Sequence, residues 1–305
     1  MIKRSASSTT RSPLAFLVLL SALSLPFWAA GALVEASELM PMSMPVSAFQ
    51  FVLPLVVAAV LVFREQGRRG VLALLKTTAS PRGFGARTWW LPVWLLIPAT
   101  ALLVFALMPL AGVPPDGAHS PLAAVPPLFA VYLVSAFAEE AGWTGYLLRP
   151  LRDRFGPLQA GLLIGIAWAA WHLVGWAQAD RSALWITGQF VSTVALRVVM
   201  VWIFEGSGGV VLTALIVHAL VNVAQSVIPG FTEHAAPALL NGAVQAFAAA
   251  LIALRLPRKG PRRPGRAPRP SPLLPRGHSM PSVRSPRRRT SVSGFPPTPS
   301  KRNDG

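Results

Sequence analysis

The sequence predicts an all-α fold, a polytopic transmembrane bundle of about eight helices. The chain is 53% hydrophobic and only 13% charged, with a mean hydropathy of +0.51. A soluble protein usually carries about twice that share of charge. A helix needs roughly 20 apolar residues to cross about 30 Å of hydrocarbon. Segments of that kind lie at about 13–34, 45–63, 89–112, 127–148, 158–177, 183–204, 209–227 and 235–254.

The charges between these segments predict the orientation of the bundle. The expected loop 64–87 holds six basic residues against one Glu, and the loop after the fourth segment is also basic. The intervening loops are neutral or acidic, as at Asp116 and Glu233. Positive charge marks cytoplasmic loops, so we expect a multi-pass protein of the cell membrane with both termini in the cytoplasm. Glu205 is the exception, because its expected cytoplasmic loop lacks positive charge.

The first apolar segment, 13–34, has two interpretations. A charged start and small residues near its end are typical of a cleaved signal peptide. Its apolar run is longer than the usual core of such a peptide, and we therefore expect a retained helix.

The formal net charge of +17 belongs mainly to a tail. Residues 255–305 contain 14 Lys or Arg, one acid and 12 prolines. Such a segment buries too little apolar surface to fold, so we expect disorder. We expect it to contact anionic lipid headgroups, with a specific protein partner as the alternative. The rest of the chain has no basic face with interleaved aromatic residues, and nucleic acid is not an expected partner.

The chain has no cysteine. This excludes disulfides, thiolate metal sites and cysteine nucleophiles. A metal ion would have to use His, carboxylate or amide ligands.

Several polar residues interrupt the apolar segments, and intramembrane ionisable residues are usually functional. At 1.5 Å per residue, Glu139 and Glu140 lie roughly 15 Å from the cytoplasmic end of their segment. His218 reaches about the same depth and His172 is a little farther, at roughly 20 Å. Asn222 shares a helix face with His218, four residues away. Any one of these side chains alone could be hydrogen-bonding glue between helices, but their common depth predicts a functional site.

Three motifs on successive segments carry a resemblance to a known family. They are Glu139-Glu140 followed by Trp143 to Leu148, then Trp168 with His172, then His218 with Asn222. In this order they resemble the CPBP intramembrane proteases, the CAAX prenyl protease 2 or abortive-infection family. The resemblance implies a catalytic helical core at 125–230, with N-terminal transmembrane helices at 1–124, a last transmembrane helix at 231–254, and the tail at 255–305.

The first motif departs from the family pattern at Thr144, where the family has an arginine. Without a nearby cation, two adjacent carboxylates away from water do not both ionise cheaply. Arg197, in the sixth segment, is the nearest candidate substitute. Its alternative interpretation is a side chain that extends to the lipid headgroups.

The resemblance implies an intramembrane endopeptidase whose substrate is a protein or peptide. It implies that Glu139 and His172 polarise a water molecule and that His218 and Asn222 hold the oxyanion. Glu140 belongs to the same catalytic motif. A second version has Glu139, His172 and His218 binding Zn²⁺, which would activate the water. The sequence leaves both versions open.

Two other classes of function remain as alternatives. A catalytically impaired relative, acting as a membrane scaffold or immunity protein, would explain Thr144. A proton-coupled transporter also uses intramembrane Glu and His, but it predicts inverted repeats, and none is convincing here. The sequence does not identify the substrate.

Overall fold

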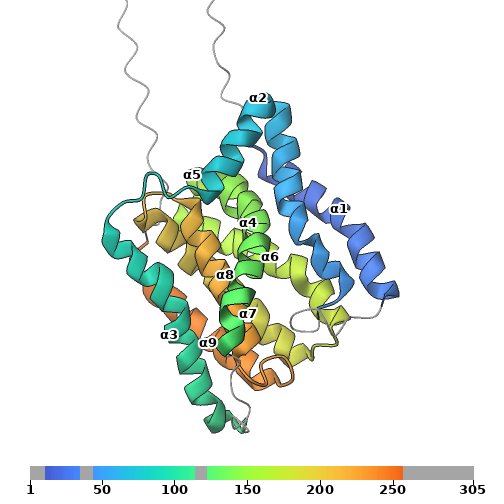
Figure 1. Ribbon diagram of the computed structural model, residues 1–305, viewed down its shortest axis with the longest axis vertical. Helices are drawn as coiled ribbons and strands as arrows, with labels where there is room; N and C mark the ends of the chain where they lie inside the picture. Colours follow the sequence, from blue (N-terminus) through green and yellow to red (C-terminus); the bar gives the residue numbers. More distant parts are fainter. Residues whose placement is uncertain (1–10, 35–43, 114–121, 257–305) are drawn as a thin grey trace, which may run out of the picture. The chain divides into compact units, whose positions relative to one another are not determined.

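The computed structural model describes residues 11–34, 44–113 and 122–256, and these form helices and short connections without a strand (Figure 1). All of them belong to one compact unit, 1–262. The α-helices are α1 (Pro13–Leu33), α2 (Leu53–Ala79), α3 (Trp90–Leu107), α4 (Val125–Gly142), α5 (Arg149–Phe155), α6 (Pro157–Gln178), α7 (Ala183–Gly206), α8 (Val211–Val227) and α9 (Ala235–Ala253).

The predicted all-α bundle is confirmed. Each of the eight apolar segments corresponds to a helix, and seven are long and apolar enough to cross a membrane. The remaining one, α8, is a shorter apolar helix of 17 residues. The predictions for the tail beyond 256 and for the loops at 35–43 and 114–121 lie outside the described residues.

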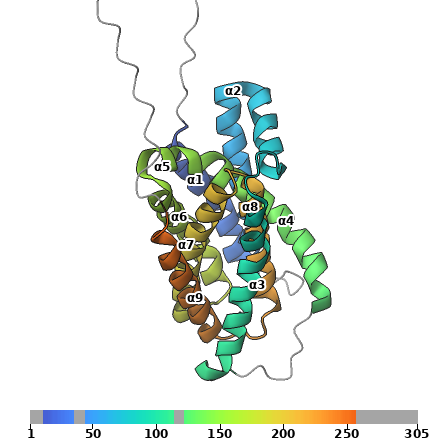
Figure 2. The same cartoon turned by 90° about the vertical axis from the view of Figure 1, so that its left-hand side faces the viewer.

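The predicted loop at 64–87 is wrong over most of its length. Helix α2 continues to Ala79, with a break at Gly67, whose φ of 64° and ψ of −164° are not helical. Its two halves meet at this break as a helical hairpin (Figures 1 and 2). Glycine adopts a positive φ at no steric cost. Most basic residues of this stretch therefore lie on a helical hairpin. Within 64–87, only the residues after Ala79 form an irregular connection.

The second apolar segment also begins differently from the prediction. A 3-10 helix, η2 (Val46–Val52), precedes α2 and places Ser47 and Gln50 inside the protein. Ser47 donates a hydrogen bond to Gln178 Oε1 at the end of α6, 2.5 Å away. This contact joins the start of η2 to the end of α6.

Helix α7 lies at the centre of the bundle and packs against α6 and α9. Close approach to α6 depends on glycine. A Cβ atom at Gly165 would lie 2.9 Å from Val194 Cα and 3.2 Å from Arg197 Cβ. Small residues allow membrane helices to approach backbone to backbone. The consequence is that Arg197 of α7 lies directly beside the part of α6 that carries Trp168 and His172.

Helix α4 changes pitch just after its glutamates. Residues Trp143–Leu148 form a π-helical stretch, η6, that leads into α5. A π-helical turn inserts an extra residue into the helix and is often found at functional sites. Here it turns Trp143, Tyr146 and Leu147 inward, where all three are fully buried.

Basic residues gather at one end of the bundle, which we name the basic end. It contains Arg11 before α1, the hairpin of α2, the start of α3, helix α5 and the end of α9 (Figures 1 and 2). Glu205 also lies there, because its carboxylate forms an ion pair with Arg152 of α5 at 3.1 Å. The charge missing from the loop at Glu205 is thus supplied by a neighbouring helix.

Candidate functional site

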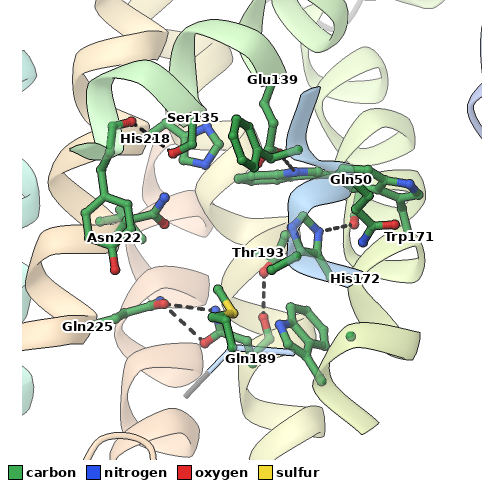
Figure 3. A pocket seen from close by; sticks show the side chains of 18 of the residues that line it. Gln50, Ser135, Glu139, Trp171, His172, Gln189, Thr193, His218, Asn222 and Gln225 are labelled. Carbon is green, nitrogen blue, oxygen red and sulfur yellow. Dashed lines mark hydrogen bonds between the residues drawn. The ribbon is translucent and has the colours of Figure 1, made fainter. Parts of the chain in front are cut away.

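The intramembrane polar residues surround a single large cavity. It has a volume of about 490 Å³, and its walls come from η2, α4, α6, α7 and α8. Four of the five predicted catalytic residues line it (Figure 3): Glu139, His172, His218 and Asn222. Most other lining side chains are aromatic or aliphatic, so the polar groups face a largely apolar space.

Trp168 contacts three of these four residues, Glu139, His172 and His218. Its indole Nε1 donates a hydrogen bond to Glu139 Oε2 at 2.8 Å. The rings of His172 and His218 meet it edge to face, with centroid distances of 5.6 and 4.9 Å. An indole nitrogen can only donate, so this contact fixes one oxygen of Glu139 and leaves the other free to accept. Trp168 is therefore a positioning residue for the carboxylate.

Each histidine uses its Nδ1 atom within the protein. His172 Nδ1 lies 2.8 Å from the carbonyl oxygen of Trp168, and His218 Nδ1 lies 3.0 Å from Glu140 Oε1. A carbonyl oxygen and a carboxylate accept hydrogen bonds, so both Nδ1 atoms donate. The Nε2 atom of each ring is therefore the nitrogen that can interact with water or a substrate in the cavity.

Glu140 differs from the prediction, because it does not line the cavity. Its carboxylate is fully buried and accepts two hydrogen bonds from Arg197, at 2.8 and 3.0 Å. Thr144 Oγ1 donates to Glu140 Oε2 at 2.5 Å, and His218 donates to the other oxygen. The guanidinium of Arg197 also lies 4.2 Å from the centre of the Trp168 ring. Arg197 thus supplies the cation that Thr144 does not, and it does not extend to the headgroups.

The residues predicted as zinc ligands, Glu139, His172 and His218, line the same cavity but do not form a metal-binding cluster. Among the residues described, no three His, Asp or Glu side chains come close enough together to hold a metal ion. The reason is visible in the contacts, since the indole of Trp168 stands among Glu139, His172 and His218. The donor set therefore does not fit a zinc site without rearrangement.

Sequence reasoning missed three glutamine side chains in the cavity wall. Gln189 of α7 and Gln225 of α8 exchange hydrogen bonds at 3.2 and 3.4 Å. Gln50 of η2 is 3% exposed, and its Oε1 has no hydrogen-bond partner among the described residues. Gln225 could have been found, because it follows Asn222 by three residues on the same helix face. Gln50 could not, because nothing in its local sequence relates it to the motifs.

The fold and the site define a class: a polytopic membrane protein with a carboxylate, two imidazoles and an amide around one cavity inside its helical bundle. Comparison with known proteins agrees with this class. Residues 121–224 match the model of a family described as type II CAAX prenyl endopeptidase Rce1-like. This part of the chain is therefore similar to the Rce1-like, or CPBP, family, and the long apolar helices are those of a multi-pass membrane protein.

One curated relative is a CAAX prenyl protease 2 from Methanococcus maripaludis. It is 28% identical to this chain over 112 residues, which is 34% of this chain and 41% of the relative. The match thus spans about two fifths of the relative's length.

Proposed function

We propose that this chain is an intramembrane endopeptidase that hydrolyses a peptide bond with a water molecule activated by Glu139 and His172. The observation that carries the proposal is the placement of Glu139, His172, His218 and Asn222 around one cavity of about 490 Å³. This volume accommodates a short extended peptide segment. The similarity of residues 121–224 to the Rce1-like family supports the same reaction.

The reaction begins with the free oxygen of Glu139. It accepts a proton from water while the water oxygen bonds to the carbonyl carbon of the substrate. His172 Nε2 accepts the second hydrogen bond of that water, because His172 Nδ1 already donates to Trp168. A base that is held in place and shielded from bulk water accelerates such a step by about 10²–10⁴-fold.

The developing negative charge on the substrate oxygen requires donors. The side-chain amide of Asn222 lines the cavity and has no other partner among the described residues. His218 is a donor through Nε2 when its ring is protonated, and Glu140 stabilises that ring through Nδ1. The carbon–nitrogen bond then breaks, and the leaving nitrogen takes the proton held by Glu139.

Glu140 and Arg197 are positioning residues in this scheme. Arg197 pairs with the fully buried carboxylate of Glu140, and Glu140 fixes the orientation of His218. The catalytically impaired alternative was based on Thr144. The Arg197–Glu140 ion pair, which supplies a cation at this position, supports the catalytic proposal. The transporter alternative predicts inverted repeats, and the sequence offers none that is convincing.

The test is hydrolysis of a peptide pool by purified protein in lipid nanodiscs. We expect new peptide termini with the wild type and with an Asn241→Ala control, and none with Glu139→Ala. Asn241 lies on α9, outside the cavity wall, and donates to Ser192. In ¹⁸O-water each new carboxylate should gain one ¹⁸O atom. Equal products from Glu139→Ala, or hydrolysis that depends on added zinc, would contradict the proposed mechanism.

A further inference from the structure

The cavity extends from Glu139 toward one end of the bundle only. Its lining residues lie at 44–51 before and within η2, 131–139 in α4, 168–179 in α6, 185–196 in α7 and 218–225 in α8. In every one of these elements the lining part lies away from the basic end. The five elements run in different directions along the bundle. In each of them, the residues that line the cavity nevertheless lie toward the end opposite the basic end.

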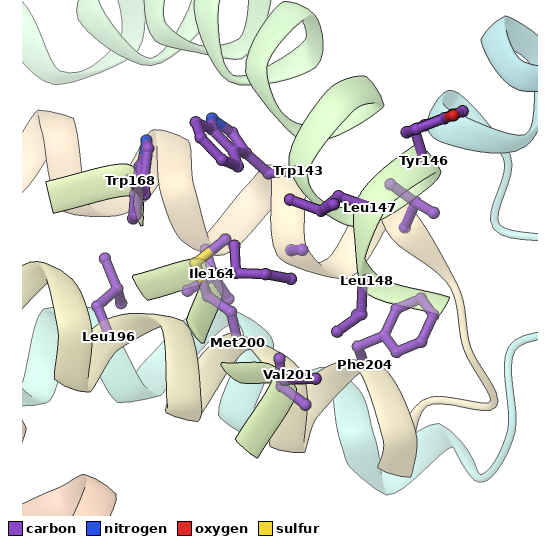
Figure 4. Close-up of a cluster of buried hydrophobic side chains, with 14 of the residues drawn as sticks. Trp143, Tyr146, Leu147, Leu148, Ile164, Trp168, Leu196, Met200, Val201 and Phe204 are labelled. Atoms are coloured by element: carbon purple, nitrogen blue, oxygen red, sulfur yellow. The ribbon is translucent and has the colours of Figure 1, made fainter. Parts of the chain in front are cut away.

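The basic end of the site is closed by a layer of large side chains. We name this the sealing layer, and each of its members is at most 1% exposed (Figure 4). It consists of Trp143, Tyr146, Leu147, Leu148, Ile164, Met200, Val201 and Phe204. The members that follow Glu140 all lie in η6, whereas the others precede Trp168 in α6 or follow Arg197 in α7. A protein interior packed this tightly leaves no room for a chain of water molecules.

The other end of the cavity carries little positive charge. Among the described residues, Arg181 is the basic side chain there, beside Asp180, and Glu233 lies in the neighbouring connection. Arg181 donates to the carbonyl oxygen of Thr232, which ties the α6–α7 connection to the α8–α9 connection. The charge asymmetry places the basic end in the cytoplasm and this end outside it.

The cavity also reaches the lateral surface of the bundle. Phe49 of η2 and Val131 and Val134 of α4 line it and are 48%, 56% and 66% exposed. Exposed apolar side chains on a membrane helix face lipid. These three lie on the outer side of Glu139, so this flank of the cavity meets the outer half of the bilayer.

We propose that the site is reached from the non-cytoplasmic side of the membrane, and that it acts on peptide segments lying in or on the outer leaflet. The access route follows from the cavity, the sealing layer and the charge asymmetry. The substrate class rests in addition on the proposed peptidase function. Cytoplasmic chain ends are not substrates on this account, because the sealing layer separates them from Glu139.

The absence of cysteine from the sequence allows a direct test of access. Single cysteines are introduced as Ser135→Cys in the cavity, Ala179→Cys at its outer end, and Thr77→Cys on the basic hairpin as the matched control. Each variant is treated with a charged, membrane-impermeant thiol reagent in right-side-out and in inverted vesicles. We expect Ser135→Cys and Ala179→Cys to react in right-side-out vesicles and to lose that reaction in inverted ones, with Thr77→Cys showing the reverse.

Three outcomes would overturn the proposal. Ala179→Cys could react from the same side as Thr77→Cys, Ser135→Cys could react from the inverted side, or Ser135→Cys could fail to react even in detergent. Labelling is repeated in a Glu139→Ala background, because access does not require activity. The labelling result therefore stands if no peptide is ever cleaved.

The substrate class is tested with a charged peptide that the purified protein cleaves. We expect this peptide to be cleaved when it is added to right-side-out vesicles and to remain intact with inverted ones. Cleavage in inverted vesicles alone would overturn the outer-leaflet substrate class. If the purified protein cleaves no peptide, the proposed function fails instead, and the two failures are distinguishable.

Discussion

Two adjacent residues of α4, Glu139 and Glu140, face two different regions of the protein. Glu139 faces a cavity and keeps one oxygen free, whereas Glu140 is enclosed by Arg197, Thr144 and His218 above the sealing layer. Successive residues of a helix point about 100° apart, so one short motif serves both regions. The comparison teaches that two adjacent carboxylates can have different roles. We assign Glu139 to the reaction and Glu140 to the buried ion pair that holds the helices together.

The largest expected effect lies on the Glu140 side. Arg197→Ala leaves a fully buried carboxylate without its cation, and breaking a buried pair in this way costs about 3–5 kcal/mol. We expect a correspondingly large loss of thermal stability in detergent. Arg154→Ala, at an exposed position of α5, is the matched control and should change stability by at most about 0.5 kcal/mol.

A second variant, with an arginine introduced at Thr144, tests the same ion pair from the other helix. Arg197 Nη1 lies 3.3 Å from Thr144 Oγ1, so the two side chains occupy one neighbourhood. We expect Thr144→Arg to recover much of the stability lost in Arg197→Ala, because the new side chain lies one turn from Glu140. Additive effects in the double-mutant cycle would show that the two positions are not interchangeable.

On the Glu139 side, Asn222→Ala should affect rate more than stability. Removing one oxyanion donor typically lowers kcat by about 10²–10³-fold. Asn222→Asp keeps the size of the side chain but replaces the donor with an acceptor, and we expect it to be equally inactive. Hydrolysis by Asn222→Ala at the wild-type rate would remove this residue from the proposed oxyanion site.

The smallest expected effect concerns the Gln189–Gln225 pair, which lies nearer the outer end of the cavity than Glu139. Gln189→Leu alone leaves Gln225 without its partner, at a cost of about 1–3 kcal/mol. Replacing both residues by Leu should be nearly neutral for stability, because no polar group is then left unpaired. The KM of the double variant is measured in parallel. An increase in KM without a loss of kcat would indicate that these glutamines contact the peptide backbone.

The orientation of the bundle in the membrane stays a prediction from the loop charges. The sequence predicted the helices and the convergence of Glu139, His172, His218 and Asn222 on one cavity. These features follow from local periodicity and from the depth of each residue in its helix. The pairing of Arg197 with Glu140 was one of two open alternatives, and the close approach of α6 and α7 at Gly165 decided it.

Other features could not be predicted, because they depend on contacts between distant segments. The hairpin at Gly67 requires helix α2 to continue past its apolar part. The basic residues of this stretch are typical of a loop, so the sequence predicted a loop there. The contribution of Gln50 depends on how η2 packs against α4 and α6. The division between Glu139 and Glu140 likewise depends on which neighbouring helix lies on each side of α4, and periodicity alone does not specify that.

The most direct test of this division compares Glu139→Gln with Glu140→Gln, each measured for thermal stability and for peptide hydrolysis. We expect Glu139→Gln to keep the wild-type melting temperature, because its amide oxygen still accepts from Trp168, and to lose about 10²–10⁴-fold in kcat. We expect Glu140→Gln to be strongly destabilised, because Arg197 is left as a buried unpaired charge. Wild-type hydrolysis by Glu139→Gln, or an unchanged melting temperature for Glu140→Gln, would contradict the account.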